Sequence, residues 1–334
     1  MNRLFLTIFV VTALVSSCWA QEPVAILDAR ISGHIHPSIC LTKSGTLVVV
    51  FKSGQQLSVS RSTDGGATWS EPSPIETSSK RPDVIRDVKK FEVYPGTADT
   101  MPDGRVLVTW NYIADDKATD GYYERALLYS LSEDDGLTWS DQALIGPVEG
   151  THLGAVRHNV LPWTGDRWLL PLRVGPPRIF DPKIGETVVF PLVGPDEKQH
   201  EFQQISRTAD GSLLAMGPVL LRSTDEGKTW TEIESFPVNS DARDNLEGRF
   251  LTTLSNGGVI VTWGVGNDNK GLRFNFSADN GQTWNPETLN LLPETAISAR
   301  YYSARTIQLD DEHVGTVFMN STGIFFLKTE TKSF

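Results

Sequence analysis

Short runs of apolar and β-branched residues recur along the chain, and a polar turn signal such as Asp-Gly or Asn-Gly precedes each of them. Successive runs begin between 45 and 62 residues apart, and no helical period of 3.6 residues is sustained. Because each interval accommodates four short strands, the pattern predicts six four-stranded antiparallel sheets. The six runs are Thr46–Phe51, Arg105–Trp110, Arg167–Leu172, Ser212–Met216, Gly258–Trp263 and Val314–Met319.

An eight-residue pattern, S-x-D-x-G-x-T-W, occurs four times, at residues 62–69, 132–139, 223–230 and 277–284. We interpret it as a turn between strands. Its Asp carboxylate accepts backbone N–H groups one or two residues on, and its Gly permits a positive φ. Its Trp supplies a large apolar side chain for packing between sheets. The four Asp residues are therefore expected to be structural and not catalytic.

Six similar units predict an all-β fold, a six-bladed β-propeller of four-stranded antiparallel blades. The strand before each turn signal is expected to be the innermost strand of its blade, and the eight-residue pattern to join the two outer strands. Blades three and six lack the pattern, and Glu186–Leu192 and Gly323–Thr329 supply strands there. Val24–Ile31 has no earlier partner, so we expect it to complete the last blade and close the ring.

The ends of the chain and its charge bear on compartment and partners. Residues 1–20 read as a signal peptide, because Arg3 precedes the apolar run Leu4–Val15 and small residues follow. Residues 21–334 are then one exported domain, expected to be monomeric, with no transmembrane segment. In a second interpretation, Val15–Cys18 resembles a bacterial lipoprotein box, which would place a lipid on Cys18. The net charge of −11 argues against nucleic acid as a partner.

Cysteine usage indicates that packing, not cross-linking, stabilises this exported domain. After cleavage at residue 20, Cys40 is the one remaining thiol, so no internal disulfide can form. It lies in the apolar stretch Ile39–Leu41, which favours a buried structural thiol over a nucleophile.

The four patterns are Asp-boxes, or BNR repeats, and with six blades the chain resembles the sialidase (neuraminidase) superfamily. This resemblance implies a Tyr nucleophile paired with a Glu, three arginines that hold the substrate carboxylate, and an Asp general acid. Tyr302-Ser303 and Glu201-x-Gln203 match the family's Tyr-Ser and Glu-x-Gln at the starts of innermost strands. Tyr302 and Glu201 are therefore the predicted catalytic residues.

The chain departs from the family pattern at the arginines and at the acid loop. Ile35 stands where the first arginine is expected, Met216 where the second is, and Lys270 is nearest to the third, with Arg273 close by. The loop that should carry the Asp shrinks to Lys52–Gln56, which has no carboxylate. An ordinary sialidase grip on a carboxylate is therefore not expected.

Other polar residues at the starts of innermost strands are predicted to line one mouth of the axial channel. Arg157 and Arg249 could replace the lost arginines, and Asp115, Asp116 or Asp120, in a longer loop of blade two, could reach over the mouth as an acid. A metal held by the histidines is an alternative, but no spacing matches a zinc pattern, so neither metal nor cofactor is predicted. The predicted substrate-binding residues are His34, His36, Arg157, His158, Glu247 and Arg249; Tyr94 and Arg173 are also placed at this mouth.

The sequence thus predicts an exported sialidase-like glycoside hydrolase that acts on acidic sugar residues of glycans. Two alternatives remain open. One is a non-catalytic propeller that binds glycan or protein at the same mouth. The other is a lyase that acts on uronic acid chains through Tyr and His.

Overall fold

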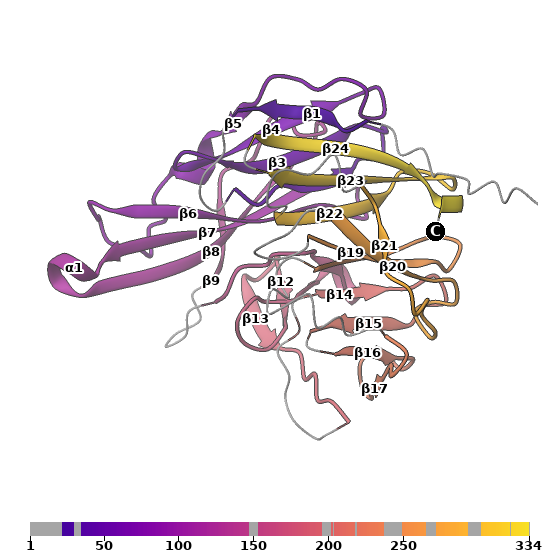
Figure 1. The fold of residues 1–334 in the computed structure, drawn as a ribbon. Helices are drawn as coiled ribbons and strands as arrows, with labels where there is room; N and C mark the ends of the chain where they lie inside the picture. The colour runs from indigo at the N-terminus through magenta and orange to yellow at the C-terminus, as the bar shows by residue number, and fades with distance from the viewer. Residues whose placement is uncertain are drawn as a thin grey trace, which may run out of the picture.

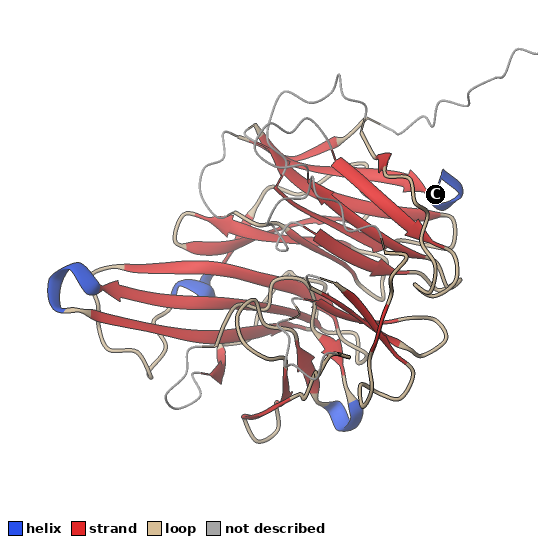
Figure 2. Ribbon diagram, turned by 60° about the horizontal axis from the view of Figure 1, so that its bottom comes forward, coloured by secondary structure: helices blue, strands red, loops and turns tan. Residues whose placement is uncertain are grey.

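The computed structural model describes residues 22–29, 35–146, 153–195, 202, 204–217, 219–236, 249–264, 272–292, 302–320 and 322–333. These residues form six four-stranded antiparallel sheets (Figure 1). Helical structure within them is confined to single turns (Figure 2). These are η1 (Glu76–Ser79), α1 (Lys117–Asp120), η2 (Thr164–Asp166) and η5 (Thr331–Ser333). The predicted fold class, a six-bladed β-propeller, is confirmed.

The first three blades each follow chain order from the inside of the ring outward. Blade one consists of β2 (Ser38–Leu41), β3 (Leu47–Ser53), β4 (Gln56–Ser62) and β5 (Ser73–Ile75). Blade two consists of β6 (Phe91–Thr100), β7 (Val106–Asp116), β8 (Tyr122–Ser132) and β9 (Ala143–Gly146). Blade three consists of β10 (Leu161–Pro162), β11 (Trp168–Leu170), β12 (Arg178–Asp181) and β13 (Glu186–Val189).

Blades four and five repeat the arrangement, and blade six departs from it. Blade four consists of β14 (Gln204–Arg207), β15 (Leu213–Met216), β16 (Leu220–Ser223) and β17 (Thr231–Glu232). Blade five consists of β18 (Arg249–Thr253), β19 (Val259–Gly264), β20 (Leu272–Ser277) and β21 (Leu289–Asn290). Blade six consists of β22 (Tyr302–Gln308), β23 (His313–Asn320), β24 (Gly323–Glu330) and β1 (Val24–Asp28).

Strand β1 closes the ring, as predicted, because it pairs antiparallel with β24 at the other end of the chain. Val24 lies opposite Phe326, and Asp28 lies opposite Gly323. The strand ends at Asp28, three residues earlier than predicted, and residues 30 and 31 lie outside the described part. This pairing gives the last blade its fourth strand and covers the edge that β24 would otherwise expose.

Each Asp-box forms the turn between the third and fourth strands of its blade. In the first, the Asp64 carboxylate accepts the Thr68 N–H at 2.9 Å and the Thr68 hydroxyl at 2.5 Å. The predicted acceptance from residues one or two positions on is thus wrong, because the carboxylate spans the whole turn. Gly66 has a φ of 94° and donates its N–H to the Ser62 hydroxyl at 2.8 Å. The other three boxes repeat these bonds.

Side-chain hydrogen bonds join each innermost strand, or the segment leading into it, to the next around the ring. Most link a side chain of one blade to the backbone of its neighbour, as where the Thr252 hydroxyl donates to the Thr306 carbonyl at 2.6 Å. The six junctions are Thr100 to Leu41, Thr97 to His158, Asn159 to Ile205, Gln204 to Leu251, Thr252 to Thr306, and Arg305 to Ser38. These bonds satisfy polar groups that the sheets leave buried near the axis.

The hydrophobic core is divided among the spaces between neighbouring blades. One cluster, for example, joins Val48 and Leu57 of blade one to Val93 and Trp110 of blade two. Cys40 lies in this cluster with 4% of its surface exposed, and burial raises the pKa of its thiol to about 12. The prediction of a buried structural thiol is therefore confirmed. Within the described residues, no helix has the length and apolarity needed to cross a membrane.

Candidate functional site

The innermost strands begin at one end of the ring, here called the mouth, and the turns that follow them lie at the other end. Because each blade starts with its innermost strand and the strands alternate in direction, Tyr94 near the start of β6 and Arg249 at the start of β18 lie at the mouth. The contacts of β2 with β6 and β22, and of β18 with β14 and β22, bring these strands side by side around the axis.

Tyr94 gathers cationic side chains from blade three around its ring. The Arg157 guanidinium lies 4.9 Å from the ring centroid and the Arg173 guanidinium 5.7 Å from it. The ring of His36, from blade one, lies 5.7 Å away, and His36 has a φ of 42°, in the left-handed region that few non-glycine residues adopt. The predicted neighbours His36 and Arg157 are thus brought to a common aromatic ring.

Arg249 is a buried cation at the mouth. Its side chain and backbone together are 7% exposed, and burial lowers the pKa of its guanidinium. Among the described residues, none forms a hydrogen bond or an ion pair with its guanidinium. A buried charge costs free energy unless a counterion offsets it, so Arg249 is poised to hold an anion.

His158, the residue after Arg157, is 3% exposed. Its ring centroid is 5.8 Å from that of Phe250, the residue after Arg249, and its backbone carbonyl accepts the Thr97 hydroxyl at 2.9 Å. His158 therefore joins blades two, three and five at the wall of the channel.

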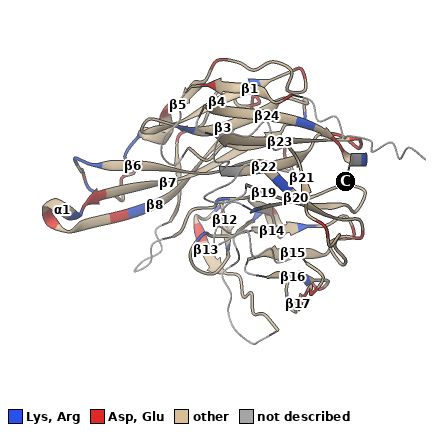
Figure 3. Ribbon diagram, viewed as in Figure 1, with Lys and Arg blue, Asp and Glu red and all other residues tan. Residues whose placement is uncertain are grey.

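Figure 3 shows Lys and Arg positions distributed over several blades among the described residues. Arg157, Arg173 and Arg249 nevertheless all lie at the mouth, in a chain of net charge −11. Basic side chains at one end of an acidic protein suit a small anionic ligand better than an extended polyanion.

Comparisons with known proteins agree with this architecture. The family model described as BNR repeat-like domain matches residues 5–149. A sialidase of Bacteroides fragilis (strain YCH46) is 26% identical over 355 aligned positions, which cover 85% of this chain and 59% of that protein. The four Asp-boxes and the six blades agree with these matches. The chain is similar to the sialidase superfamily of BNR-repeat proteins.

Solved structures support the fold of this propeller. The intramolecular trans-sialidase of Ruminococcus gnavus superposes with a TM-score of 0.62 at 12% identity, over 91% of this chain and 96% of that one. A Dyadobacter fermentans protein of unknown function gives 0.61 at 17% identity, over 92% and 99%. The Trypanosoma rangeli sialidase gives 0.64 at 12%, over 92% and 58%. The propeller spans about 59% of the length of its curated relative, so these likenesses establish fold and not activity.

Two positions where the superfamily resemblance implies arginine have apolar roles in this propeller. Ile35 packs against the core cluster that contains Ile39 and Phe51, and Met216, at the end of β15, is 3% exposed. Both side chains are part of the hydrophobic core, so these two positions serve packing in this protein and not the binding of a carboxylate. Any carboxylate grip at this mouth therefore depends on arginines in other blades.

The acid loop of blade one is a tight hairpin, as its sequence predicts. Ser53 pairs directly with Gln56, and Gly54 turns the chain with a φ of 64°. Lys52, with a side chain 11% exposed, forms an ion pair of 2.8 Å with Glu92 of blade two. This propeller therefore carries a lysine on the hairpin and receives a carboxylate from the next blade.

Asp120, in the loop predicted to supply an acid, forms an ion pair instead. Asp120, in α1, bonds to Arg86, and this contact lowers the pKa of its carboxyl. A general acid needs a raised pKa near neutral pH, so the environment of Asp120 opposes that role. Figure 1 shows α1 at the tip of the long strands of blade two, at the edge of the molecule.

The predicted catalytic pair is only partly described. Tyr302 begins β22, where its backbone pairs with Met319, but its side chain lies outside the described part. Glu201, Glu247 and His34 also lie outside the described residues. Their roles stay predictions.

Two polar residues that the sequence reasoning did not single out occupy the axis. Arg305 of blade six and Asp99 of blade two form an ion pair of 2.6 Å, and Arg305 also donates to the Ser38 and Thr97 hydroxyls. Val160 of blade three donates its N–H to Asp99 at 2.9 Å. The sequence signal was a charged residue at an inward position of two innermost strands. Both terminal nitrogens of Arg305 bond within this network, so they are not available to a substrate.

Proposed function

We propose that this propeller is a sialidase-like glycoside hydrolase that acts on acidic sugar residues of glycans. The observation that carries the proposal is Arg249, a buried guanidinium at the mouth to which no described residue gives a counterion. Arg157 and Arg173 lie at the same mouth around Tyr94. Guanidinium groups bind carboxylates through paired, charge-assisted hydrogen bonds, so they would hold the carboxylate of the sugar.

The proposed chemistry is a two-step displacement with Tyr302 as nucleophile and Glu201 as its base. The phenolic oxygen bonds to the anomeric carbon while the glycosidic C–O bond breaks, and the leaving oxygen takes a proton from an acid at the mouth. Water then attacks the anomeric carbon and releases Tyr302. A Tyr nucleophile is an accepted variant among retaining glycosidases.

A panel of aryl glycosides tests the proposal, with sialic, glucuronic and galacturonic acid as acidic sugars and glucose as the neutral comparison. We expect turnover of an acidic member, its loss in Tyr302→Phe, and a raised KM in Arg249→Gln. Turnover that survives in Tyr302→Phe would overturn the assignment of the nucleophile. Uronate polymers followed by the ultraviolet absorbance of an unsaturated product test the elimination route, for which His36 and Tyr94 lie 5.7 Å apart.

The second candidate function is a non-catalytic propeller that binds acidic glycans at the same mouth. The hairpin that replaces the acid loop favours this binding function. Where the family has an Asp that protonates the leaving group, this hairpin has Lys52, whose ammonium is held in an ion pair with Glu92. Binding of acidic monosaccharides without turnover of any glycoside, and with equal affinity in Tyr302→Phe, is the result expected for this candidate.

A further inference from the structure

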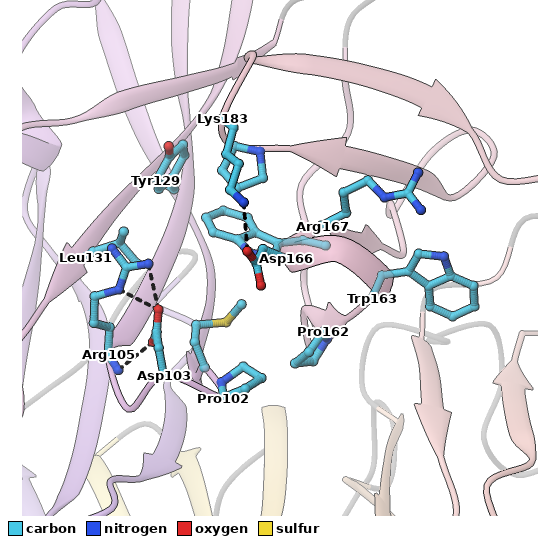
Figure 4. Close-up of a pocket in the computed structure, with 13 residues that line it drawn as sticks. Pro102, Asp103, Arg105, Tyr129, Leu131, Pro162, Trp163, Asp166, Arg167 and Lys183 are labelled. Atoms are coloured by element: carbon cyan, nitrogen blue, oxygen red, sulfur yellow. Dashed lines mark hydrogen bonds and ion pairs between the residues drawn. The ribbon is translucent and has the colours of Figure 1, made fainter.

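A cavity of about 490 Å³ lies between blades two and three, at the end of the ring away from the mouth (Figure 4). Its walls include the turn between β6 and β7, the turn η2, and the turn between β12 and β13. All three turns follow the ends of strands that run away from the mouth. The cavity is therefore separate from the site described above. Its volume falls within the range of small-molecule sites, roughly 300–1,000 Å³.

The walls combine flat apolar rings with a few placed polar groups. Tyr129, Trp163 and Trp168 line the cavity together with three prolines. The ring of Tyr129 meets that of Trp168 edge-on at 5.0 Å, and Phe190 packs against Trp163 at 5.5 Å, so the aromatic rings are held in place. Rigid aromatic and proline surfaces bind the C–H faces of a ring-shaped ligand, because the negative face of the π-system attracts weakly positive hydrogens.

The charged groups of the cavity are paired before any ligand arrives. Asp103 accepts two hydrogen bonds from Arg105, from its backbone N–H at 3.0 Å and from Nε at 2.8 Å, and forms an ion pair with Nη2 at 2.7 Å. Asp166 is bound by Lys183 at 2.8 Å. Figure 4 shows these two pairs on the walls from different blades. Paired charges attract an ion weakly, but their exposed oxygens and N–H groups can still bond to a polar ligand.

We propose that this cavity is a second carbohydrate-binding site, which takes a neutral pyranose unit of a glycan. The hydroxyl groups of a neutral sugar both donate and accept, so they match carboxylate oxygens and cationic N–H groups held side by side. Its C–H faces match the aromatic and proline walls. A free anion or cation would have to compete with the existing ion pairs. The site does not depend on the proposed activity at the mouth.

The variants that test this site preserve the local backbone. Asp166 has a φ of 63°, and Asn tolerates that region as Asp does. Asp103→Asn keeps a carbonyl oxygen for the Arg105 N–H. Asp210 is a matched control outside the cavity, because it accepts the Ser212 N–H at 3.0 Å and an arginine, Arg222, at 2.6 Å in the equivalent turn of blade four.

The experiment is saturation-transfer NMR of the full chain with maltose, cellobiose, lactose and chitobiose, each tested alone. We expect at least one disaccharide to bind, and binding to weaken by at least about tenfold in the double variant Asp103→Asn/Asp166→Asn. Asp210→Asn and the mouth variant Arg249→Gln should bind as the unaltered chain does. The proposal is overturned if no disaccharide binds, if the double variant binds equally well, or if binding is lost in Arg249→Gln instead. The mouth assay with aryl glycosides fails or succeeds independently of this result.

Discussion

The Arg305 guanidinium and the Asp99 carboxylate form a buried ion pair of 2.6 Å that links the innermost strands of blades six and two across the axis. Their side chains are only 6% and 12% exposed. Ser38 and Val160 bond to the same pair, so four of the six blades meet at it. The pair also fixes the strand that begins at Tyr302. This ion pair therefore connects blade six, in which the ring closes, to blades one, two and three.

Removing one partner of this pair is expected to be strongly destabilising. Arg305→Met should lower the free energy of unfolding by about 3–5 kcal/mol, because Asp99 would remain buried without its counterion. The double variant Asp99→Leu/Arg305→Met should lose much less than the sum of the two single variants. Urea unfolding of the four proteins measures this coupling. Strict additivity of the two losses would mean that the pair is not coupled.

Arg249, unlike Arg305, is expected to contribute to ligand binding and not to the stability of the fold. Burial lowers the pKa of its guanidinium, which means that the fold disfavours the charged form. Arg249→Gln should therefore leave the free energy of unfolding unchanged or raise it. Binding of an acidic monosaccharide should weaken by roughly 1.5–3 kcal/mol, about ten- to a hundredfold, since one charge-assisted contact is lost.

Two measurements separate these effects. Thermal unfolding reports the stability of Arg249→Gln, and calorimetric titration with glucuronate or N-acetylneuraminate reports its affinity. Arg249→Lys serves as the control, because it keeps the charge but cannot form paired hydrogen bonds with a carboxylate. A large loss of stability in Arg249→Gln with unchanged affinity would show that the residue is structural.

The fold could be predicted from the sequence because its signals are local. A turn of the Asp-box type is set by Asp64, Gly66 and Thr68 within a few residues, and four copies fix the number of similar units. The short predicted strands differ from the observed ones mainly at their ends. In blade three, for example, Arg167–Leu172 shortens to Trp168–Leu170, because the chain leaves the sheet on both sides.

The site was harder to predict because its contacts join distant parts of the chain. Sequence position placed Arg157 and Tyr94 at one mouth, but not within 4.9 Å of each other. No feature of the sequence around Asp99 or Arg305 indicates that these two residues, 206 positions apart, form an ion pair. The pairing of Lys52 with Glu92 is similarly a product of how two blades pack, and only the absence of a carboxylate in the hairpin could be read from the sequence.

The Asp-boxes predict how stability depends on pH. Hydrogen bonds from Thr68 lower the pKa of the Asp64 carboxyl from 3.8 to about 2, and those from Thr229 lower that of Asp225 to about 2. Because these folded-state values lie below the unfolded ones, the stabilisation is complete above the ordinary pKa. It is lost as pH falls from 3.8 toward 2. Stability should therefore decrease through this window.

A variant identifies the contribution of one box. Asp64→Asn should be less stable than the unaltered chain at neutral pH, and the difference should narrow between pH 3.8 and 2. Urea unfolding across this range measures it. Glu71→Gln, at an exposed position just after the same turn, removes a charge but no bond of the turn. If its stability difference narrowed equally, general charge repulsion and not the Asp-box would explain the acid sensitivity.

Gly66 and Gly54 offer a matched test of how the Asp-box docks on the neighbouring blade. Both have positive φ, 94° and 64°, so a substitution by Ala strains the backbone at either position by about 1–2 kcal/mol. A Cβ at Gly66 would also overlap the ring of Phe326 in blade six, whereas one at Gly54 would meet open space. Gly66→Ala should therefore cost about 1–3 kcal/mol more than Gly54→Ala, the usual cost of overpacking. Chemical unfolding of both variants measures the difference. Equal losses would mean that Phe326 yields freely, and that the first Asp-box turn does not need close contact with blade six to hold the ring closed.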